Sequence, residues 1–169
     1  MTDRHELLEK LNSGRDEFLA SVDGVTEEQA AVKPAAGWSI LECAEHVAIV
    51  EENLRHRLME ATPIDHEMPR KREALIVALA ANRMRKVPAP EGALPQGRFA
   101  TLSQAAESFR RSREQTIAYI ASCEVDLRRV TMEHPLMGAV SGQEMILMMI
   151  AHPFRHALQV REGRALLST

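Results

Sequence analysis

Two histidines four residues apart, His152 and His156, form the pair of residues in this chain whose types and spacing most directly suggest a metal-binding or catalytic site. They lie in a strongly apolar stretch, residues 145–160, which we predict to be helical. Side chains four residues apart lie one turn above each other on the same face of a helix. Two imidazoles at this spacing can therefore point at one spot, as two metal ligands on a single helix must.

A third histidine, His46, lies much earlier in the chain, on the predicted inner face of another amphipathic helix. If the two helices pack together, three imidazoles converge. Three protein ligands leave an open position on the metal, as reactive rather than closed structural sites do. Three neutral imidazoles suit Zn²⁺, Ni²⁺ or Fe²⁺. We predict a divalent metal at His46, His152 and His156; the alternative is that these histidines are bonded to neighbours or water.

Three side chains close to His46 in sequence, Cys43, Glu42 and Glu45, could contribute to the same site. Cys43, one turn earlier, is expected to be a small packing residue, with a thiolate ligand as the alternative. Either Glu42 or Glu45 offers a carboxylate acceptor for a ring N–H. Of the two, Glu45 is expected to face solvent.

Side chains near the later pair are also open to two interpretations. We expect Arg155 to form a salt bridge to a neighbouring helix, the alternative being an anionic substrate. His134 is expected to be a loop histidine, the alternative being a proton carrier at a pocket mouth. A late group of methionines is expected to fill the core, the alternative being an adaptable pocket lining. This group is Met132, Met137, Met145, Met148 and Met149. The remaining histidines, His5, His56 and His66, are expected at the surface.

Composition limits the classes of partner. At 169 residues, with 45% hydrophobic and 27% charged, we expect one domain over residues 1–169 with a real core. Aromatic residues are only 4%, too few for a stacking platform on single strands, and the net charge of −3 disfavours duplex binding. There is no glycine-rich phosphate loop, G-x-S-x-G or H-E-x-x-H motif. The expected partner is a small-molecule substrate, not nucleic acid.

The two cysteines and the N-terminus predict the compartment. Cys43 and Cys123 fall among apolar helical positions, so we expect buried thiols in a reducing compartment. The first residues lack the apolar core of a signal peptide. The longest apolar run, residues 145–151, is far short of the roughly 20 residues that cross a bilayer. We expect a soluble, cytoplasmic protein with no membrane partner, and a homodimer is left open.

Helical patterns recur along the chain, and no stretch alternates in the manner of a strand, so we expect no sheet. Long helices are predicted over 3–21, from Ser39 onward, over 101–122, and over 141–163 with Gly163 as the stop. A further helix, 70–85, lies between connectors 62–69 and 87–97. Residues 26–29 and 123–133 add short turns. This order predicts an all-α fold, an antiparallel four-helix bundle with short inserted helices.

Pro153 directly follows His152. Inside a helix, proline lacks an N–H and clashes with the carbonyl four residues back, here Met149. Either the helix kinks, with the freed carbonyl facing a cavity or water, or a new helix begins with Pro153 as its first residue. Both arrangements can aim the two imidazoles together.

Three stretches resemble the DinB-like, YfiT-like family of four-helix-bundle proteins, described as metal-dependent enzymes. Residues 37–47, GWSILECAEHV, resemble its W-S-x-x-E-x-x-x-H segment. Residues 86–90, KVPAP, with Leu94-Pro95 resemble the proline-rich linker of one branch. Residues 141–160, ending HPFRHALQV, resemble its terminal H-x-x-R-H-x-x-Q helix. The likeness spans residues 7–161.

The resemblance implies that the family's metal ligands fall on His46, His152 and His156. It also implies a use for low-molecular-weight thiols, because members include S-transferases and isomerases that depend on bacillithiol or mycothiol. We therefore expect a metal-dependent small-molecule enzyme, either a thiol-dependent S-transferase or a hydrolase. For the transferase, such a thiol is the cosubstrate that the resemblance implies. The alternative is a non-catalytic, stress-associated bundle that binds or scaffolds.

Overall fold

Six α-helices make up most of the structure, a computed structural model that describes residues 4–84 and 87–167. The predicted positions Asp3, Arg85 and Lys86 lie outside these residues. The helices are α1 (Arg4–Val22), α2 (Glu27–Ala31), α3 (Ile40–Met59), α4 (Glu73–Ala81), α5 (Leu102–Ser122) and α6 (Gly142–Leu167), with short 3₁₀ turns η1 (Arg70–Arg72) and η2 (Glu91–Ala93), and strands β1 (Thr62–Pro63), β2 (Val130–His134) and β3 (Gly138–Ser141).

The predicted capping boxes fix where the two histidine-bearing helices begin. At α3, the Ser39 hydroxyl accepts the Glu42 N–H at 3.1 Å, and the Glu42 carboxylate accepts the Ser39 N–H at 2.8 Å. The same reciprocal pair joins Ser141 and Glu144 before α6, again at 3.1 and 2.8 Å. Each box satisfies two N–H groups that would otherwise lack a partner at a helix start.

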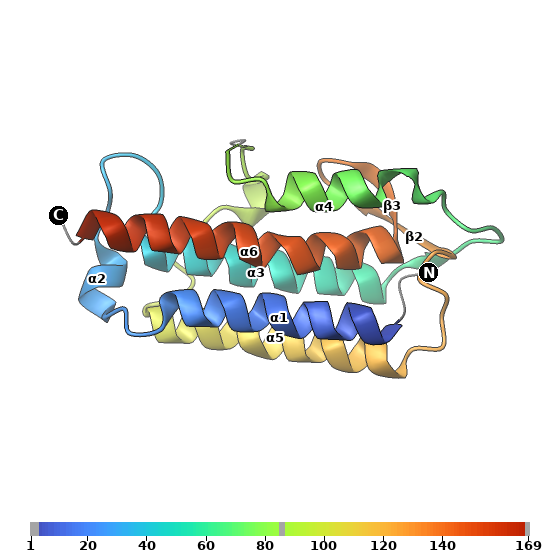
Figure 1. Cartoon of the computed structure of the whole chain (residues 1–169), viewed down its shortest axis with the longest axis horizontal. Helices are drawn as coiled ribbons and strands as arrows, with labels where there is room; N and C mark the ends of the chain where they lie inside the picture. Colours follow the sequence, from blue (N-terminus) through green and yellow to red (C-terminus); the bar gives the residue numbers. More distant parts are fainter. Residues whose placement is uncertain (1–3, 85–86, 168–169) are drawn as a thin grey trace.

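Four long helices, α1, α3, α5 and α6, form the bundle (Figure 1). Helix α1 packs against α5 and α6, and α3 packs against the same two. The expected antiparallel arrangement holds only in part, because α1 and α6 run in one direction and α3 and α5 in the other (Figure 1). The reason is the long segment between α3 and α5, which crosses back along the outside of the bundle through α4.

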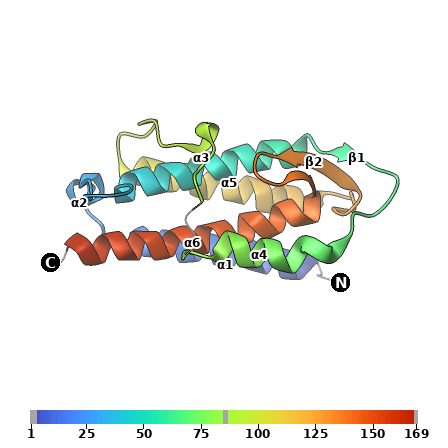
Figure 2. The same ribbon diagram turned by 90° about the horizontal axis from the view of Figure 1, so that it is seen from above.

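Helix α4 lies outside the bundle, packed on α6 (Figures 1 and 2). It is shorter than predicted: Asn82 has an extended backbone and ends it. Ile76 is its one buried residue among those described. The proline-rich connector that follows contains the turn η2, although its prolines and glycines predict no regular element.

The expectation of no sheet is wrong. Strands β1, β2 and β3 form a small antiparallel sheet, with Thr131 opposite Ser141 and His134 opposite Gly138. It lies at the end of the bundle where α3 ends and α6 begins (Figure 2). Gly138, at φ 67°, supplies the left-handed backbone that starts the return strand. Strands this short contain too few residues for a convincing alternation.

Helix α6 continues past Pro153 and past the stop expected at Gly163. It continues beyond Gly163 to Leu167, and a side chain at Gly163 would begin 3.2 Å from Ile40 Cγ1, so this glycine permits close packing against α3. Pro153 lies inside the same continuous helix, so no new helix starts there. The Met149 carbonyl accepts a hydrogen bond from the buried side chain of Arg113.

The core fills the space between the four long helices. The predicted stripe of α1, Leu7, Leu11, Phe18 and Val22, is buried. Phe18 meets Phe109 of α5 edge-on, with ring centroids 5.1 Å apart. Among the described residues, no helix is both long and apolar enough to cross a membrane.

Candidate metal centre

His46 projects from α3 toward α6 and is 5% exposed. Its Nδ1 lies 2.6 Å from the backbone carbonyl of Ala93, in turn η2. A carbonyl only accepts, so Nδ1 carries the proton and donates, which leaves Nε2 with a lone pair. The Trp38 ring lies 4.7 Å from the His46 ring, centroid to centroid, with the two planes tilted by 45°.

A buried carboxylate holds the connector that carries Ala93. Glu45, 1% exposed, accepts the backbone N–H groups of Gln96, Gly97 and Arg98 at 2.7, 3.2 and 3.0 Å. The expectation that Glu45 faces solvent is therefore wrong, because the connector covers this side of α3. Neither Glu42 nor Glu45 accepts a histidine ring N–H. The Glu45 carboxylate accepts backbone N–H groups of the connector instead.

Glu42 serves the start of α3. Besides completing the capping box, its carboxylate pairs with Lys33 at 2.5 Å. The acceptor for the His46 ring is a backbone carbonyl, which no side-chain motif could have indicated.

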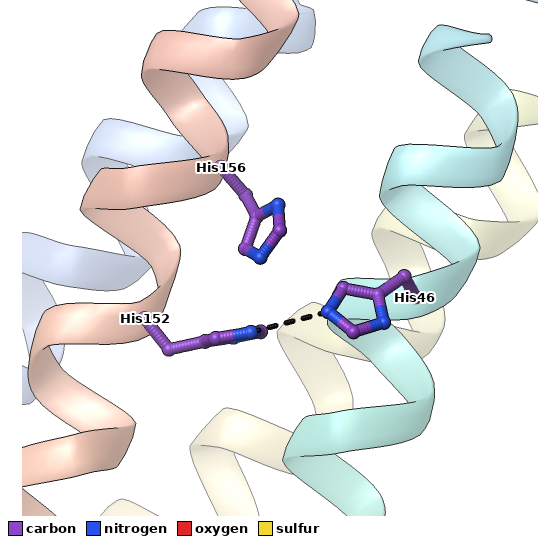
Figure 3. Close-up of side chains that lie close together, drawn as sticks. All are labelled: His46, His152 and His156. Atoms are coloured by element: carbon purple, nitrogen blue, oxygen red, sulfur yellow. Dashed lines mark hydrogen bonds between the residues drawn. The ribbon is translucent and has the colours of Figure 1, made fainter. Parts of the chain in front are cut away.

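His152 and His156 lie on the same face of α6, as their spacing predicts (Figure 3). The Nδ1 of His156 donates to the side-chain oxygen of Gln159 at 3.0 Å, which leaves its Nε2 free to bind. Pro153, between the two histidines, does not separate them: their ring centroids are 4.4 Å apart.

The three imidazoles converge between α3 and α6 (Figure 3). One ring nitrogen from each lies within 4.8 Å of the others, and the Nε2 atoms of His46 and His152 are 3.3 Å apart. Two ligands at 2.0–2.1 Å from a tetrahedral Zn²⁺ lie roughly 3.3 Å from each other. The separation of 3.3 Å between these two nitrogens thus matches a pair of ligands on one ion.

All three histidines are held neutral. Burial lowers the pKa of His46, and lowers those of His152 and His156 well below the ordinary value of 6.5. The neighbouring histidines add to this effect at His152 and His156, and the positive charge of Arg155 adds to it at all three. Neutral imidazole is the form that binds metal, so the donor set, the separation of His46 and His152, and the acceptors behind His46 and His156 fit a divalent ion.

Cys43 lies behind His156 rather than among the ligands. Its Sγ is 3.6 Å from the His156 Nδ1 and 3.9 Å from the His156 carbonyl, on the side of the ring away from Nε2. Burial raises the pKa of this thiol to about 12. The geometry agrees with the packing interpretation.

The other candidates do not belong to the group of three ring nitrogens. Arg155 donates to the backbone carbonyl of Asn82, just after α4. His134 stands at the end of β2, where its Nδ1 accepts the Leu136 N–H at 3.2 Å. The late methionines fill the core, as expected: Met145, Met148 and Met149 are buried in it, and Met132 and Met137 pack against it. The histidines expected at the surface, His5, His56 and His66, are exposed.

Solved structures with this fold are known. A protein described as TT2238, a four-helix bundle protein, is 20% identical, with a TM-score of 0.61 over 94% of this chain and 98% of that one. YfiT from Bacillus subtilis, described as a probable metal-dependent hydrolase with an unusual four-helix bundle topology, is 13% identical, with a TM-score of 0.63 over 99% and 89%. At these identities the likeness establishes the fold alone.

Among curated proteins, none matches the chain. The model of one family does, over residues 10–160, which include all three site histidines. The chain belongs to the DinB superfamily.

Proposed function

We propose that this protein is a metal-dependent enzyme acting on a small molecule, with His46, His152 and His156 as the ligands of one divalent ion. The observation that carries the proposal is the convergence of three neutral imidazoles, of which His46 and His156 are buried and His152 is half-buried, with the Nε2 atoms of His46 and His152 3.3 Å apart. The description of the Bacillus subtilis neighbour as a probable metal-dependent hydrolase supports it.

A Zn²⁺, Ni²⁺ or Fe²⁺ ion held by three imidazoles would supply an open position at which water or a thiol loses a proton readily and becomes a nucleophile. The chain's own groups prepare that position. The Ala93 carbonyl and the Gln159 side chain orient two of the rings. The Trp38 ring packs against the His46 ring, and the positive charge of Arg155 favours a substrate or cosubstrate that carries negative charge.

Two reactions use such a position: transfer of a thiol to an electrophile, and hydrolysis. For the first, a low-molecular-weight thiol is the cosubstrate we propose, because a thiolate combines affinity for these metals with negative charge. For the second, water takes the same place and no cosubstrate is needed.

Metal analysis of untagged protein tests the site. We expect close to one Zn, Ni or Fe per chain in the wild type and strong depletion in each of His46→Ala, His152→Ala and His156→Ala. The exposed histidines give matched controls, and His56→Ala and His66→Ala should retain the metal. Full retention in all three site variants would refute the proposal.

Turnover separates the reactions. Metal-loaded protein is given electrophiles with and without low-molecular-weight thiols, and ester or amide substrates without thiol. Thiol-dependent product that disappears in His152→Ala supports the transferase, and thiol-independent cleavage supports the hydrolase. Stoichiometric metal with no turnover in either arm would favour a non-catalytic binding role.

A further inference from the structure

One carbonyl of α6 cannot make its helical hydrogen bond. The carbonyl of Met149 would accept the N–H of residue 153, but Pro153 has no N–H. Both residues are buried, so water cannot easily replace the missing donor. An unpaired carbonyl in such a place would be costly.

Arg113 of α5 supplies the missing donor. Its Nη2 donates to the Met149 carbonyl at 2.6 Å. The side chain is 0% exposed, an unusual position for an arginine, and it is fully engaged. Its Nε and Nη2 each lie 2.7 Å from a carboxylate oxygen of Glu51 on α3, and Nη1 donates to the Leu11 carbonyl of α1 at 2.9 Å.

The close approach of α1 to this point depends on a glycine. A Cβ at Gly14 would lie 3.0 Å from the Ile150 carbonyl and 3.5 Å from the Arg113 Nη1. A larger residue would therefore push against the backbone of α6 next to the freed carbonyl. Through its hydrogen bonds to Leu11, Glu51 and Met149, the guanidinium of α5 thus joins all four long helices.

This junction lies about one turn from the site on both histidine-bearing helices. On α3, Glu51 follows His46 by five residues, and on α6, Met149 precedes His152 by three. A rise of 1.5 Å per residue makes these spacings roughly 7.5 and 4.5 Å along each helix. The guanidinium thus links α3 to α6 beside the place where their histidines must meet.

We propose that Arg113 is a positioning residue for the three-histidine site: it takes the carbonyl that Pro153 leaves without a donor and thereby sets His152 against His46. This inference rests on the proposed function. The competing explanation is that the pair Arg113 and Glu51 merely stabilises the core, without effect on ligand geometry.

Arg113→Lys tests the proposal. Lysine keeps a positive charge for Glu51, but its single ammonium lacks the planar fork that serves Glu51 and Met149 together. The probe is Co²⁺, whose visible absorption reports the geometry of its ligands. We expect the variant to bind Co²⁺ about 10-fold more weakly, the lower end of the range for losing a direct partner of the ligands, because Arg113 acts through the Met149 carbonyl, and with an altered spectrum. Arg110→Lys, on the exposed face of the same helix, is the matched control and should change neither.

A second substitution distinguishes positioning from general stability. In Pro153→Ala, residue 153 regains an N–H that can serve the Met149 carbonyl. If Arg113 acts through that carbonyl, Arg113→Lys should weaken Co²⁺ binding far less in the Pro153→Ala background than in the wild type. Equal fold-losses in the two backgrounds, or an unchanged spectrum in Arg113→Lys, would overturn the proposal.

A paired variant covers the case in which lysine prevents folding. Arg113→Met combined with Glu51→Leu removes both charges, so neither is left buried alone. It should show the same weakened Co²⁺ binding, again reduced in the Pro153→Ala background; wild-type affinity and spectrum would overturn the proposal. Wild-type protein that binds no Co²⁺ would refute the proposed function itself and the positioning role with it. Binding by the wild type with no loss in the variants would refute only the role of Arg113.

Discussion

Glu45→Gln should lower both the stability of the fold and the metal affinity of the site, because this carboxylate binds the backbone of the connector behind His46. Its Oε1 accepts the N–H groups of Gln96 and Arg98, and its Oε2 accepts that of Gly97. Glutamine has the same shape but only one oxygen. At best it keeps the two bonds to Oε1 and turns an NH₂ group toward the Gly97 N–H, so that two donors face each other.

The expected cost follows from the contact that is lost. A hydrogen bond to a charged group contributes about 1.5–3 kcal/mol, and the Gly97 N–H is left facing a donor. We expect Glu45→Gln to lower the free energy of unfolding by roughly 2–3 kcal/mol. For a chain of this length that is a fall in Tm of about 4–12 °C. The side chain is almost fully buried, so solvent screening does not reduce this figure.

The effect should also reach the metal. The connector that Glu45 holds carries the Ala93 carbonyl, which fixes the His46 ring. Loosening it should reduce metal affinity by about 10-fold, the lower end of the range for lost outer partners. Denaturant unfolding of apoprotein measures the first effect, and competition with a chelating dye measures the second.

Glu52→Gln is the matched control. Glu52 lies on the same helix and pairs with Arg98 of the same connector at 3.7 Å, but both side chains are about half exposed. A surface pair of this kind contributes little, so the change in stability should stay within about 0.5 kcal/mol. If Glu45→Gln were no more destabilising than Glu52→Gln, the reasoning about the buried carboxylate would be refuted. A loss of stability with unchanged metal affinity would break the link from connector to ligand.

Three further outcomes are expected. Removing the metal with a chelator should lower Tm but preserve the helical circular dichroism, since the bundle has its own core; a random-coil spectrum would contradict this. Burial holds the folded pKa values of the site histidines below 6.5, so the unfolded chain takes up protons first, and the apoprotein should lose stability as the pH falls below about 6.5. Urea unfolding between pH 8 and 5, roughly the range in which histidine titrates, should show this slope, and replacing the three histidines by glutamine should flatten it. Gly142→Ala should destabilise despite alanine's higher helix propensity, because its Cβ would lie 2.8 Å from Val130 Cγ2 and 2.9 Å from the Leu127 carbonyl; Gly92→Ala, with open space at that point, is the control and should be neutral in thermal melts.

Local rules account for what could be predicted from the sequence. The pair His152 and His156 follows from helix geometry, and the capping boxes at Ser39 and Ser141 involve residues three apart. Both are determined within one turn of chain. That His46 faces them follows from its apolar neighbours on α3, because a stripe of buried residues fixes which side of a helix points inward.

The errors arise where distant segments meet. Nothing near Glu45 in sequence covers its face of α3, so the sequence alone predicts an exposed side chain; the connector that covers it comes some fifty residues later. The sequence does not indicate strand β2, because Val130–His134 is stabilised by pairing with β3 and not by its own pattern. The path of a connector and the pairing of short strands depend on the assembled bundle, which a single sequence does not display.

Arg113 is the instructive omission, because the sequence does contain a signal for it. The inward residues of α5 include Ala105, Phe109, Thr116 and Ile120, and Arg113 falls on that stripe, one turn after Phe109. A charge on an apolar stripe requires a partner, and Glu51 occupies the matching kind of position on α3. What the sequence could not show is that the partner set includes a carbonyl released by a proline on a third helix.

The two sides of the site are therefore controlled differently. His152 and His156 are fixed to each other by one helix, and their place relative to α3 depends on the contacts of Arg113. The orientation of His46 depends instead on the connector, through the Ala93 carbonyl and the Glu45 carboxylate. Perturbing α6 must move two ligands together, whereas perturbing the connector moves one. Variants at Glu45 and Arg113 should accordingly give different Co²⁺ spectra even where they weaken binding equally, since each distorts a different part of the ligand set.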